Sequence, residues 1–177
     1  MSKDIIVNVR TNILRSSRLF YGWSVSPFGE TLIFLNNNEV SALGFKNGKD
    51  KLEIEFELKA LWKNKCITYE EINTSNIIEE IFFKNCTIDI VLQGTHFQLK
   101  VWNALLTIPS GTTTHYADIA KKIGNPQSIR AVASAIAKNP IAWLIPCHRV
   151  LRKSGDLGGY RWGENIKRRM LSSELLK

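Results

Sequence analysis

The chain has 177 residues, of which 44% are hydrophobic and 23% are charged. These values are ordinary for one globular domain or two small ones, and they argue against long disordered segments. The 24 Lys and Arg outnumber the 16 Asp and Glu, but the excess is uneven: residues 1–93 carry a net charge of −1 and residues 94–177 one of +9. This asymmetry predicts that the C-terminal half meets a polyanion, most often nucleic acid or an anionic membrane.

Further features exclude several classes of protein. No apolar run approaches the roughly 18–20 residues of a membrane span, and the first ten residues lack the apolar core of a secretory signal. Cys66, Cys86 and Cys147 are odd in number and widely spaced, which favours a reducing compartment over a disulfide scaffold. We therefore expect a cytoplasmic protein, or a nuclear one in a eukaryote. Because there are three histidines, no CxxC pair and no HExxH motif, we expect no metal site.

The N-terminal half is typical of strands followed by helix. The predicted elements are, in chain order, a strand at residues 5–9, a turn at 26–29, hairpin strands at 31–35 and 40–45 around an Asn-Asn-Asn turn, a helix at 76–83 and a strand at 87–92. Residues 53–58 alternate polar and apolar side chains as a half-buried strand does, but residues 57–65 fit a helix equally well. That boundary stays open.

The C-terminal half predicts short helices separated by turns, and we place the domain boundary near Gly94. Thr95 and Gln98 have the spacing of a capping box, so a helix begins there and ends at the Ile-Pro-Ser-Gly turn of residues 108–111. A short helix over residues 116–123 is followed by Gly124. Asn125 is the expected N-cap of the next helix, with Pro126 at its first position, and that helix runs to about Lys138.

A helix, a Gly-containing turn and a second helix over residues 116–138 form the sequence pattern of a helix-turn-helix, although an ordinary helical hairpin has the same pattern. On the second helix, one face carries Ile129, Val132 and Ile136 and is expected to be buried. A neighbouring face places one arginine among three small residues, which permits close approach to a duplex: Arg130, Ala133, Ser134 and Ala137. Together with the net charge of +9, this favours DNA contact, with little base-specific readout and strong salt dependence.

Cys147 lies in the most unusual stretch, between a proline and a histidine. A free thiol with a pKa near ~8.5 is mostly protonated at neutral pH, so a nucleophilic cysteine needs a base or a positive environment. His148 could supply the base; adjacent side chains on an extended segment point opposite ways, which favours a bridging water over direct contact. Candidates to orient the imidazole are Asp118, Asp156, Glu164 and Glu174. A buried structural cysteine is the alternative, and we assign Cys66 and Cys86 to that class.

The stretch Pro-Cys-His-Arg-Val at residues 146–150 resembles the active-site signature of the O6-alkylguanine-DNA alkyltransferases, also called methylated-DNA–protein-cysteine methyltransferases. The resemblance covers about residues 94–174. It includes the segments Gly-Thr-His-Phe-Gln at 94–98, Ile-Pro-Ser-Gly at 108–111, Tyr-Ala-Asp-Ile-Ala at 116–120, Arg-Ala-Val at 130–132 and Gly-Gly-Tyr-Arg-Trp-Gly at 158–163. The N-terminal half is only loosely similar, chiefly through Ser-Pro-Phe-Gly at 26–29.

The resemblance implies a catalytic group of five residues. Cys147 attacks the O6-alkyl carbon of an extruded guanine, in one in-line displacement. His148 acts as the base through water and Glu174 orients it. Tyr116 hydrogen-bonds the guanine ring, and Asn139 holds the turn before the active site.

The resemblance also implies the contacts with DNA and with the lesion. Arg130 fills the gap left in the base stack, and the further residues expected on DNA are Thr95, Gln127, Ala131 and Ser134. Lys121, Lys122 and Lys138 are placed for phosphates. The expected pocket residues are Ile136, although the helical wheel puts it on the core side, Val150, Tyr160 and Arg161. Arg149 is expected to bridge a carboxylate or carbonyls, whereas Lys167, Arg168 and Arg169 are expected on a solvated face.

The implied protein is a single-turnover suicide enzyme that acts as a monomer on duplex DNA containing O6-alkylguanine, and also on O4-alkylthymine. Its product, an S-alkylcysteine, is not reversed by the usual thiol cycle. No cofactor is implied, because the lesion itself is the alkyl donor. The zinc ligands of some relatives are missing, since residues 1–65 contain neither Cys nor His. The implied fold is an α/β, ribonuclease-H-like N-terminal domain (1–93) and a mainly α C-terminal domain (94–177) with the helix-turn-helix.

Two alternatives belong to other classes. A non-catalytic binder of alkylated DNA resembles the same family but lacks the cysteine, and Cys147 argues against it. A transcription regulator would use the same helix pair, but the chain lacks the extra cysteine-rich domain of methylation-responsive relatives.

Overall fold

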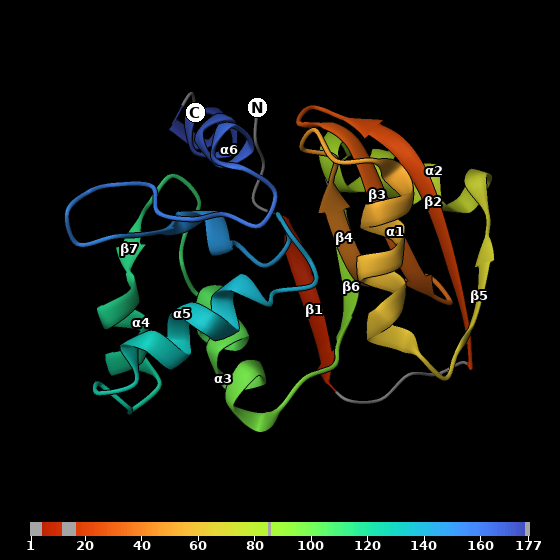
Figure 1. Ribbon diagram of the computed structural model, residues 1–177. Helices are drawn as coiled ribbons and strands as arrows, with labels where there is room; N and C mark the ends of the chain where they lie inside the picture. Colours follow the sequence, from red (N-terminus) through yellow and green to blue (C-terminus); the bar gives the residue numbers. More distant parts are fainter. Residues whose placement is uncertain (1–4, 12–16, 85, 176–177) are drawn as a thin grey trace. The chain divides into compact units, whose positions relative to one another are not determined.

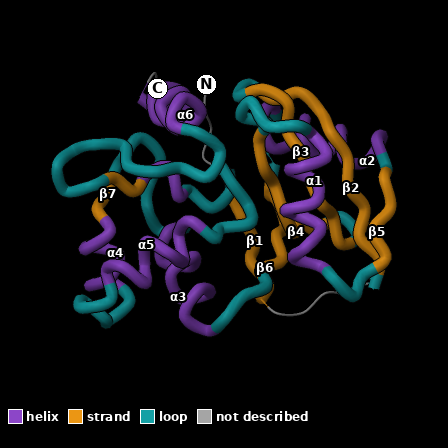
Figure 2. The backbone as a smooth tube through the Cα atoms, viewed as in Figure 1, coloured by secondary structure: helices purple, strands orange, loops and turns teal. Residues whose placement is uncertain are grey.

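The computed structural model describes residues 5–11, 17–84 and 86–175 (Figure 1). These residues divide into two compact units, one spanning Ile5–Gln93 and the other beginning at Gly94. We call them the N-terminal and the C-terminal unit. Strands dominate the first and helices the second, as Figure 2 shows. Among the described residues, no helix combines the length and the apolar character needed to cross a bilayer.

A six-stranded mixed sheet forms the N-terminal unit, in the order β1-β6-β4-β3-β2-β5. The strands are β1 (Ile6–Thr11), β2 (Arg18–Ser26), β3 (Gly29–Asn36), β4 (Glu39–Phe45), β5 (Cys66–Tyr69) and β6 (Thr87–Leu92). Strands β2, β3 and β4 pair antiparallel, which confirms the predicted hairpin and the turn before it, while β5 pairs parallel with β2, and β6 pairs parallel with β1 and β4. The unit thus has the predicted α/β character.

Two helices, α1 (Lys51–Lys59) and α2 (Glu71–Phe83), pack on opposite faces of this sheet (Figure 1). On β2, Trp23 donates a hydrogen bond from its indole to Glu55 of α1 at 2.8 Å. A Cβ on the preceding residue, Gly22, would clash with Oγ1 of Thr74 on α2. Because successive residues of a strand face opposite sides, these contacts place α1 on one face and α2 on the other.

Several boundaries differ from the sequence expectations. The open segment 53–58 is helical, because Asp50 caps α1 by accepting from the backbone N–H of Leu52 at 2.7 Å. Helix α2 begins five residues earlier than predicted, where Glu70 caps it through the N–H of Asn73. Strands β2 and β5 were not predicted, since β2 contains an interior glycine and β5 is a short, largely exposed edge strand.

The C-terminal unit is mainly helical. It contains α3 (His96–Leu105), α4 (Tyr116–Lys122), α5 (Ile129–Ala137), α6 (Glu164–Leu175), a 3₁₀ turn at Cys147–Arg149 and the short parallel strands β7 (Thr114–His115) and β8 (Val150–Leu151). The capping box at the start of α3 is confirmed: Thr95 and Gln98 exchange both hydrogen bonds. The buried Trp102 joins α3 to α5 by donating its indole N–H to the Ala135 carbonyl at 2.9 Å.

The predicted start of α5 is wrong. The carbonyl of Asn125 accepts from the N–H and the hydroxyl of Ser128, so residues 125–128 form a turn of their own and α5 begins at Ile129. As the first residue of the helix, Ile129 is 43% exposed, whereas Val132 and Ile136 are buried as expected. The end of α4 at Gly124, which has φ of +74°, agrees with the sequence.

Candidate active site

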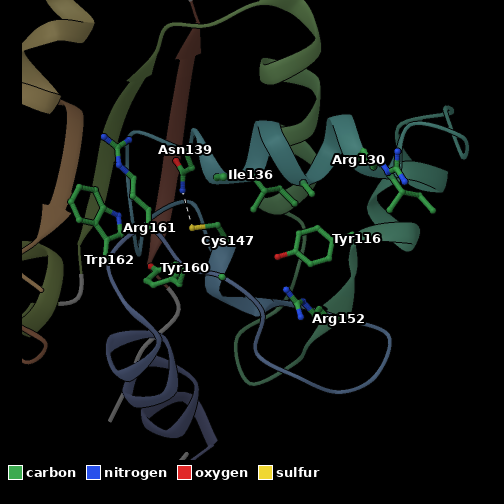
Figure 3. A pocket seen from close by; sticks show the side chains of 13 residues that line it. Tyr116, Arg130, Ile136, Asn139, Cys147, Arg152, Tyr160, Arg161 and Trp162 are labelled. Atoms are coloured by element: carbon green, nitrogen blue, oxygen red, sulfur yellow. Dashed lines mark hydrogen bonds between the residues drawn. The ribbon is translucent and has the colours of Figure 1, made fainter.

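A cavity of about 550 Å³ opens in the C-terminal unit around Cys147. Its wall comes from α4, α5, the residues just after α5, and the loop between β8 and α6 (Figure 3). This volume lies in the range of small-molecule sites, and one nucleobase fits in it. Three of the lining side chains are cationic, Arg130, Arg152 and Arg161, and no lining residue is acidic.

Asn139 organises the chain that leads to the cysteine. It is 2% exposed, accepts from the N–H of Ile141 at 3.0 Å and donates to the carbonyls of Ile141 and Ile145 at 3.2 and 3.1 Å. Its Nδ2 also lies 3.2 Å from Sγ of Cys147, the dashed contact in Figure 3. One buried amide therefore fixes the turn of residues 139–147 and donates to the thiol sulfur at the same time.

Trp143 lies at the apex of this turn with a φ of +68°. The N–H of Leu144 donates to the carbonyl of Ala142 at 2.8 Å, so Trp143 is the central residue of a γ-turn with positive φ. A bulky residue in this region costs on the order of 1–3 kcal/mol and persists only where its surroundings impose it. The Trp143 ring stacks on His148, with centroids 5.3 Å apart and planes inclined by 11°.

Cys147 begins a 3₁₀ turn rather than the extended segment that we expected, because the N–H of Arg149 bonds back to the carbonyl of Pro146 at 3.1 Å. The thiol is 6% exposed. Burial raises the pKa of Cys147, while Asn139 and Tyr160 act in the opposite direction by hydrogen bonding to sulfur. The thiol is therefore protonated at neutral pH, and a thiol in that state becomes a nucleophile only where a base can take its proton.

His148 and Glu174 form a buried pair beside the cysteine. Nε2 of His148 lies 3.0 Å from Oε1 of Glu174. Because an ionised carboxylate only accepts, Nε2 carries the proton and Nδ1, which is buried without a hydrogen-bond partner, is the nitrogen left to act as base. Burial lowers the pKa of His148, and Glu174 counteracts that effect. Of the four acids considered from the sequence, the structure brings Glu174 to the imidazole.

Arg149 holds Glu174 in its charged form. Its Nε lies 3.1 Å from both carboxylate oxygens and its Nη2 lies 2.7 Å from Oε1, while Nη1 donates to the Ile108 carbonyl. Burial alone would raise the pKa of Glu174, but the hydrogen bonds from His148 and Arg149 lower it to about 2. Arg149 was expected to bridge a carboxylate or carbonyls, and the structure gives it both kinds of partner.

Lys167 corrects one expectation. It does not lie on a solvated face with Arg168 and Arg169, which are exposed, but is 1% exposed. Its Nζ donates to the carbonyls of Val150, at 2.8 Å, and Leu157, so it ties together the ends of the loop that leads to the pocket. Burial lowers the pKa of Lys167 to about 8. Lys167 lies seven residues before Glu174, so both residues fall on the same face of α6. This spacing is the sequence signal that Lys167 points inward.

Two tyrosines face the cavity from different segments, Tyr116 at the start of α4 and Tyr160 in the loop after β8 (Figure 3). Burial raises the pKa of both phenols, and that of Tyr160 lies well above its ordinary value. Both hydroxyls are therefore proton donors across the neutral range. Arg152 lies beside Tyr116 and opposes the rise of its pKa. Arg161 lines the cavity and contacts the Trp162 ring, with Cζ 4.9 Å from its centroid.

Comparisons with known proteins agree with this site. Residues 96–176 match the family described as 6-O-methylguanine DNA methyltransferase, DNA binding domain. A methylated-DNA–protein-cysteine methyltransferase of Methanosarcina acetivorans is 37% identical over 159 residues, which are 88% of this chain and 98% of the relative. The chain belongs to the methylated-DNA–protein-cysteine methyltransferase family. The family and the enzyme class predicted from the sequence are thereby confirmed.

Other members of the methyltransferase family resemble this chain in sequence or in fold. The inducible enzyme of Bacillus subtilis is 50% identical over 91 residues, about half of each chain. The Mycobacterium tuberculosis O6-methylguanine methyltransferase has a TM-score of 0.73 and 33% identity, with 89% of this chain and 93% of that one covered. A structure of the M. tuberculosis protein in complex with DNA has a TM-score of 0.71 and 32% identity, over 90% and 93% of the two chains.

The structure places the remaining predicted residues of this methyltransferase in three groups. Arg130 and Ile136 of α5 line the cavity, and the helical-wheel conflict over Ile136 disappears because that residue is both 6% exposed and part of the wall. Ala131 and Ser134 are exposed on α5 and Gln127 in the turn before it, outside the wall. Thr95 is exposed at the cap of α3, and Val150 is buried behind the wall with its carbonyl bound by Lys167.

Several residues of the site were missed from the sequence, among them Arg152, Trp162 and Trp143; Ile129, expected in the core, also lines the cavity. Arg152 and Trp162 line the cavity, but neither position has a periodicity that separates a wall residue from a loop residue. The placement of Trp143 depends on a backbone turn with positive φ, and no glycine or asparagine in the sequence indicates that turn. Among the described residues, no group of three or more His, Cys, Asp or Glu side chains is arranged to hold a metal ion.

Proposed function

We propose that the protein repairs alkylated DNA by transferring the alkyl group of O6-alkylguanine, and of O4-alkylthymine, from duplex DNA to Cys147. The observation that carries this proposal is the placement of one buried thiol on the wall of a base-sized cavity, next to a His–Glu pair. A guanine in a duplex cannot reach a buried sulfur, so the base must be extruded into the cavity. The protein acts as a monomer.

The chemical step is an in-line displacement at the alkyl carbon. The proton of Cys147 passes through water to Nδ1 of His148, and Glu174 stabilises the resulting imidazolium. The S–C bond forms as the C–O6 bond breaks, and the electron pair moves onto the guanine. The guanine takes a proton through the Tyr116 hydroxyl, so the proton that it gains balances the one that Cys147 gave up. Tyr116 hydrogen-bonds the leaving base and Asn139 keeps sulfur in line. Because the thioether has no good leaving group, each molecule acts once, and no cofactor takes part.

The cavity residues then have distinct roles. Ile136 lies against the extruded nucleoside, and Tyr160 and the backbone of Arg161 close the site near O6. The carbonyls of Cys147 and Val150 accept from the guanine amino group. The Val150 carbonyl has a second lone pair for this, besides the one that binds Lys167.

DNA is bound by α4 and α5 acting as a helix-turn-helix, with α5 against the duplex. Arg130, which is exposed at the mouth of the cavity, takes the place of the extruded base. Small exposed side chains around it, Ala131 and Ser134 among them, allow close approach but little base readout. The sugar-phosphate backbone of the DNA is contacted by Thr95, Gln127, Lys121, Lys122 and Lys138. Binding should therefore weaken steeply with salt.

We infer that the N-terminal unit is the ribonuclease-H-like domain of the family, which its mixed α/β sheet supports, and that the domain boundary lies at residue 94, where the compact units divide. A reducing compartment, the cytoplasm or a eukaryotic nucleus, fits the three free cysteines.

The decisive experiment is intact-mass measurement after incubation with a duplex that contains O6-methylguanine. The protein should gain one methyl group, on the peptide that contains Cys147, and an undamaged duplex should cause no gain. Cys147→Ala should show no gain yet still bind the damaged duplex. An unchanged mass of the parent protein would make it a binder of alkylated DNA rather than an enzyme. A parallel incubation with O4-methylthymine tests the second substrate.

A further inference from the structure

Trp143 stacks on His148, the proposed base, yet the displacement mechanism gives it no role. Its φ of +68° puts a bulky residue in the left-handed region, where glycine and asparagine are the usual occupants. The other non-glycine residue with positive φ in the described chain is Asn37, in the β3–β4 hairpin turn. Asn37 suits its turn, whereas Trp143 does not suit a γ-turn on conformational grounds. Something other than the turn must favour the indole there.

The contact that the turn produces is the stack on His148. The two rings are nearly parallel, inclined by 11°, with centroids 5.3 Å apart. His148 is fully buried and Trp143 is partly exposed, so the indole covers one face of the imidazole. Glu174 holds the edge of the His148 ring through Nε2, and Trp143 holds one of its faces, so the ring plane is fixed. Nδ1 of His148 therefore points in one direction only.

The surroundings of His148 disfavour the protonated, positively charged imidazole. The charged or titratable groups that face it are Glu174 and Lys167 from α6, and Arg149 and Cys147 from its own turn. Arg149 and Lys167 oppose a positive imidazole, and burial opposes it more strongly. An aromatic face stabilises a cation within about 6 Å of its centroid without adding another charge. Trp143 has this geometry.

We propose that Trp143 is a positioning residue for the methyl-transfer step: its indole fixes the plane of His148 and stabilises the imidazolium that forms when His148 takes the Cys147 proton. The inference rests on the proposed function, in which His148 is the base. It assigns a purpose to the γ-turn, because the turn is what brings the indole over the imidazole.

The test compares three substitutions. Trp143→Phe keeps an aromatic face, Trp143→Leu keeps bulk without one, and Trp143→Gly suits the positive φ but removes the ring. Single-turnover transfer from an O6-methylguanine duplex should slow at least tenfold in the Leu and Gly variants and return to within about threefold of the parent in the Phe variant. Asn37→Gly, which changes a positive-φ residue in the other unit, should leave the rate unchanged. Equal losses in all three Trp143 variants, or no loss in any, would overturn the proposal.

A second measurement does not require catalysis. His148 is titrated directly: its ring-proton NMR signals are followed against pH, and His96→Gln and His115→Gln variants assign them. Loss of the indole makes the imidazolium less stable, so the pKa of His148 should fall by at least half a pH unit in the Gly and Leu variants, and less in the Phe variant. A His148 pKa equal to the parent's would contradict the role of Trp143 at His148. If the parent transfers no methyl group, the proposed function fails, whereas the titration still decides whether Trp143 acts on His148.

Discussion

The two units bury different chemistry. In the N-terminal unit, the buried polar residues are mostly neutral and serve the sheet and its turns: Ser26, Thr31, Asn36, Ser41 and Thr74, with Glu39, which pairs with Arg10, as the charged exception. In the C-terminal unit the buried polar set is Asn139, His148, Lys167 and Glu174, and three of these four can ionise. The ion pairs of the N-terminal unit, such as Lys46–Glu30, lie largely at its surface.

This difference separates stability from function. A sheet with an apolar core has no energetic need for buried charge, and burying a charge costs several kcal/mol unless it is paired. The C-terminal unit nevertheless buries His148, Lys167 and Glu174. Perturbed titratable groups gathered in a cavity are the physical mark of a reaction site. If this division holds, substitutions of the buried polar groups of the C-terminal unit should slow transfer, and substitutions of the surface pairs of the N-terminal unit should not.

The largest effect is expected from Glu174→Gln. The neutral amide leaves the partly buried Arg149 guanidinium without a countercharge and weakens the support of His148. The free energy of unfolding should therefore fall by about 3 kcal/mol, and transfer should slow by about 100-fold. Denaturant unfolding and single-turnover rates measure the two effects. Glu164→Gln is the matched control, because Glu164 lies on the same helix in an exposed pair with Arg168.

The pH dependence of this loss has a defined sign. The pKa of Glu174 is about 2 in the folded protein against an ordinary value of 4.5, so its contribution to stability is present above pH 4.5 and is lost as the pH falls from 4.5 towards 2. The stability difference between the parent and Glu174→Gln should shrink over that window. Parallel stability curves through the window would show that Glu174 is not held as an ion in the folded state.

Asn139→Ala is expected to have the next largest effect. The substitution leaves the N–H of Ile141 and the carbonyls of Ile141 and Ile145 without their buried partner, which should cost about 2 kcal/mol of folding free energy. It also removes the donor to Cys147 sulfur, so the thiolate midpoint should rise and transfer should slow at neutral pH. Asn139→Asp keeps the acceptor but not the donors. If Asp restored both stability and rate, the donor to sulfur would be unimportant.

How far the sequence predicts such a site depends on the kind of information involved. The Pro-Cys-His-Arg-Val motif, the Thr95 capping box and the helix pair are local patterns, and each can be recognised in the sequence alone. Lys167 is intermediate, since its spacing from Glu174 indicates a shared face but its neighbours Arg168 and Arg169 mark an exposed one. The stack of Trp143 on His148 depends on a γ-turn held by Asn139 from outside it. No local pattern encodes a contact of that kind.

The prediction of the fold from the sequence is limited in the same way. The hairpin of β3 and β4 followed from alternation and an Asn-rich turn. Strand β5 forms because β2 offers it a parallel partner, with paired residues 48 positions apart (Arg18 with Cys66). Helix α5 starts late because Ser128 bonds to the Asn125 carbonyl, although Asn125 and Pro126 are good residues for a helix start. At α5 a competing local hydrogen bond overrode a valid propensity for a helix start, and at β5 a tertiary pairing produced a strand that local pattern did not indicate.

A smaller effect is expected from Lys167→Met. Loss of Nζ leaves the carbonyls of Val150 and Leu157 without this donor, but it also removes a buried charge, so the net loss of stability should be about 1 kcal/mol. Transfer should slow by about tenfold, because the loop that carries Tyr160 loosens. Since the pKa of Lys167 is about 8 in the folded protein against 10.5 ordinarily, the parent should gain stability between pH 8 and 10.5 and Lys167→Met should lack that gain. Arg168→Met, at the exposed neighbour, should change neither quantity.

The smallest effect is expected from Lys59→Ala in the N-terminal unit. Lys59 pairs with Glu55 at 2.8 Å and lies over the Tyr21 ring at 3.9 Å, yet about a third of its side chain is exposed, so water and salt screen both contacts. The free energy of unfolding should fall by less than about 1 kcal/mol, and this loss should diminish further in 1 M salt. The rate of methyl transfer should equal the parent's. A slower rate with unchanged stability would mean that the N-terminal unit contributes to the reaction, and the division between a stabilising unit and a reacting unit would then fail.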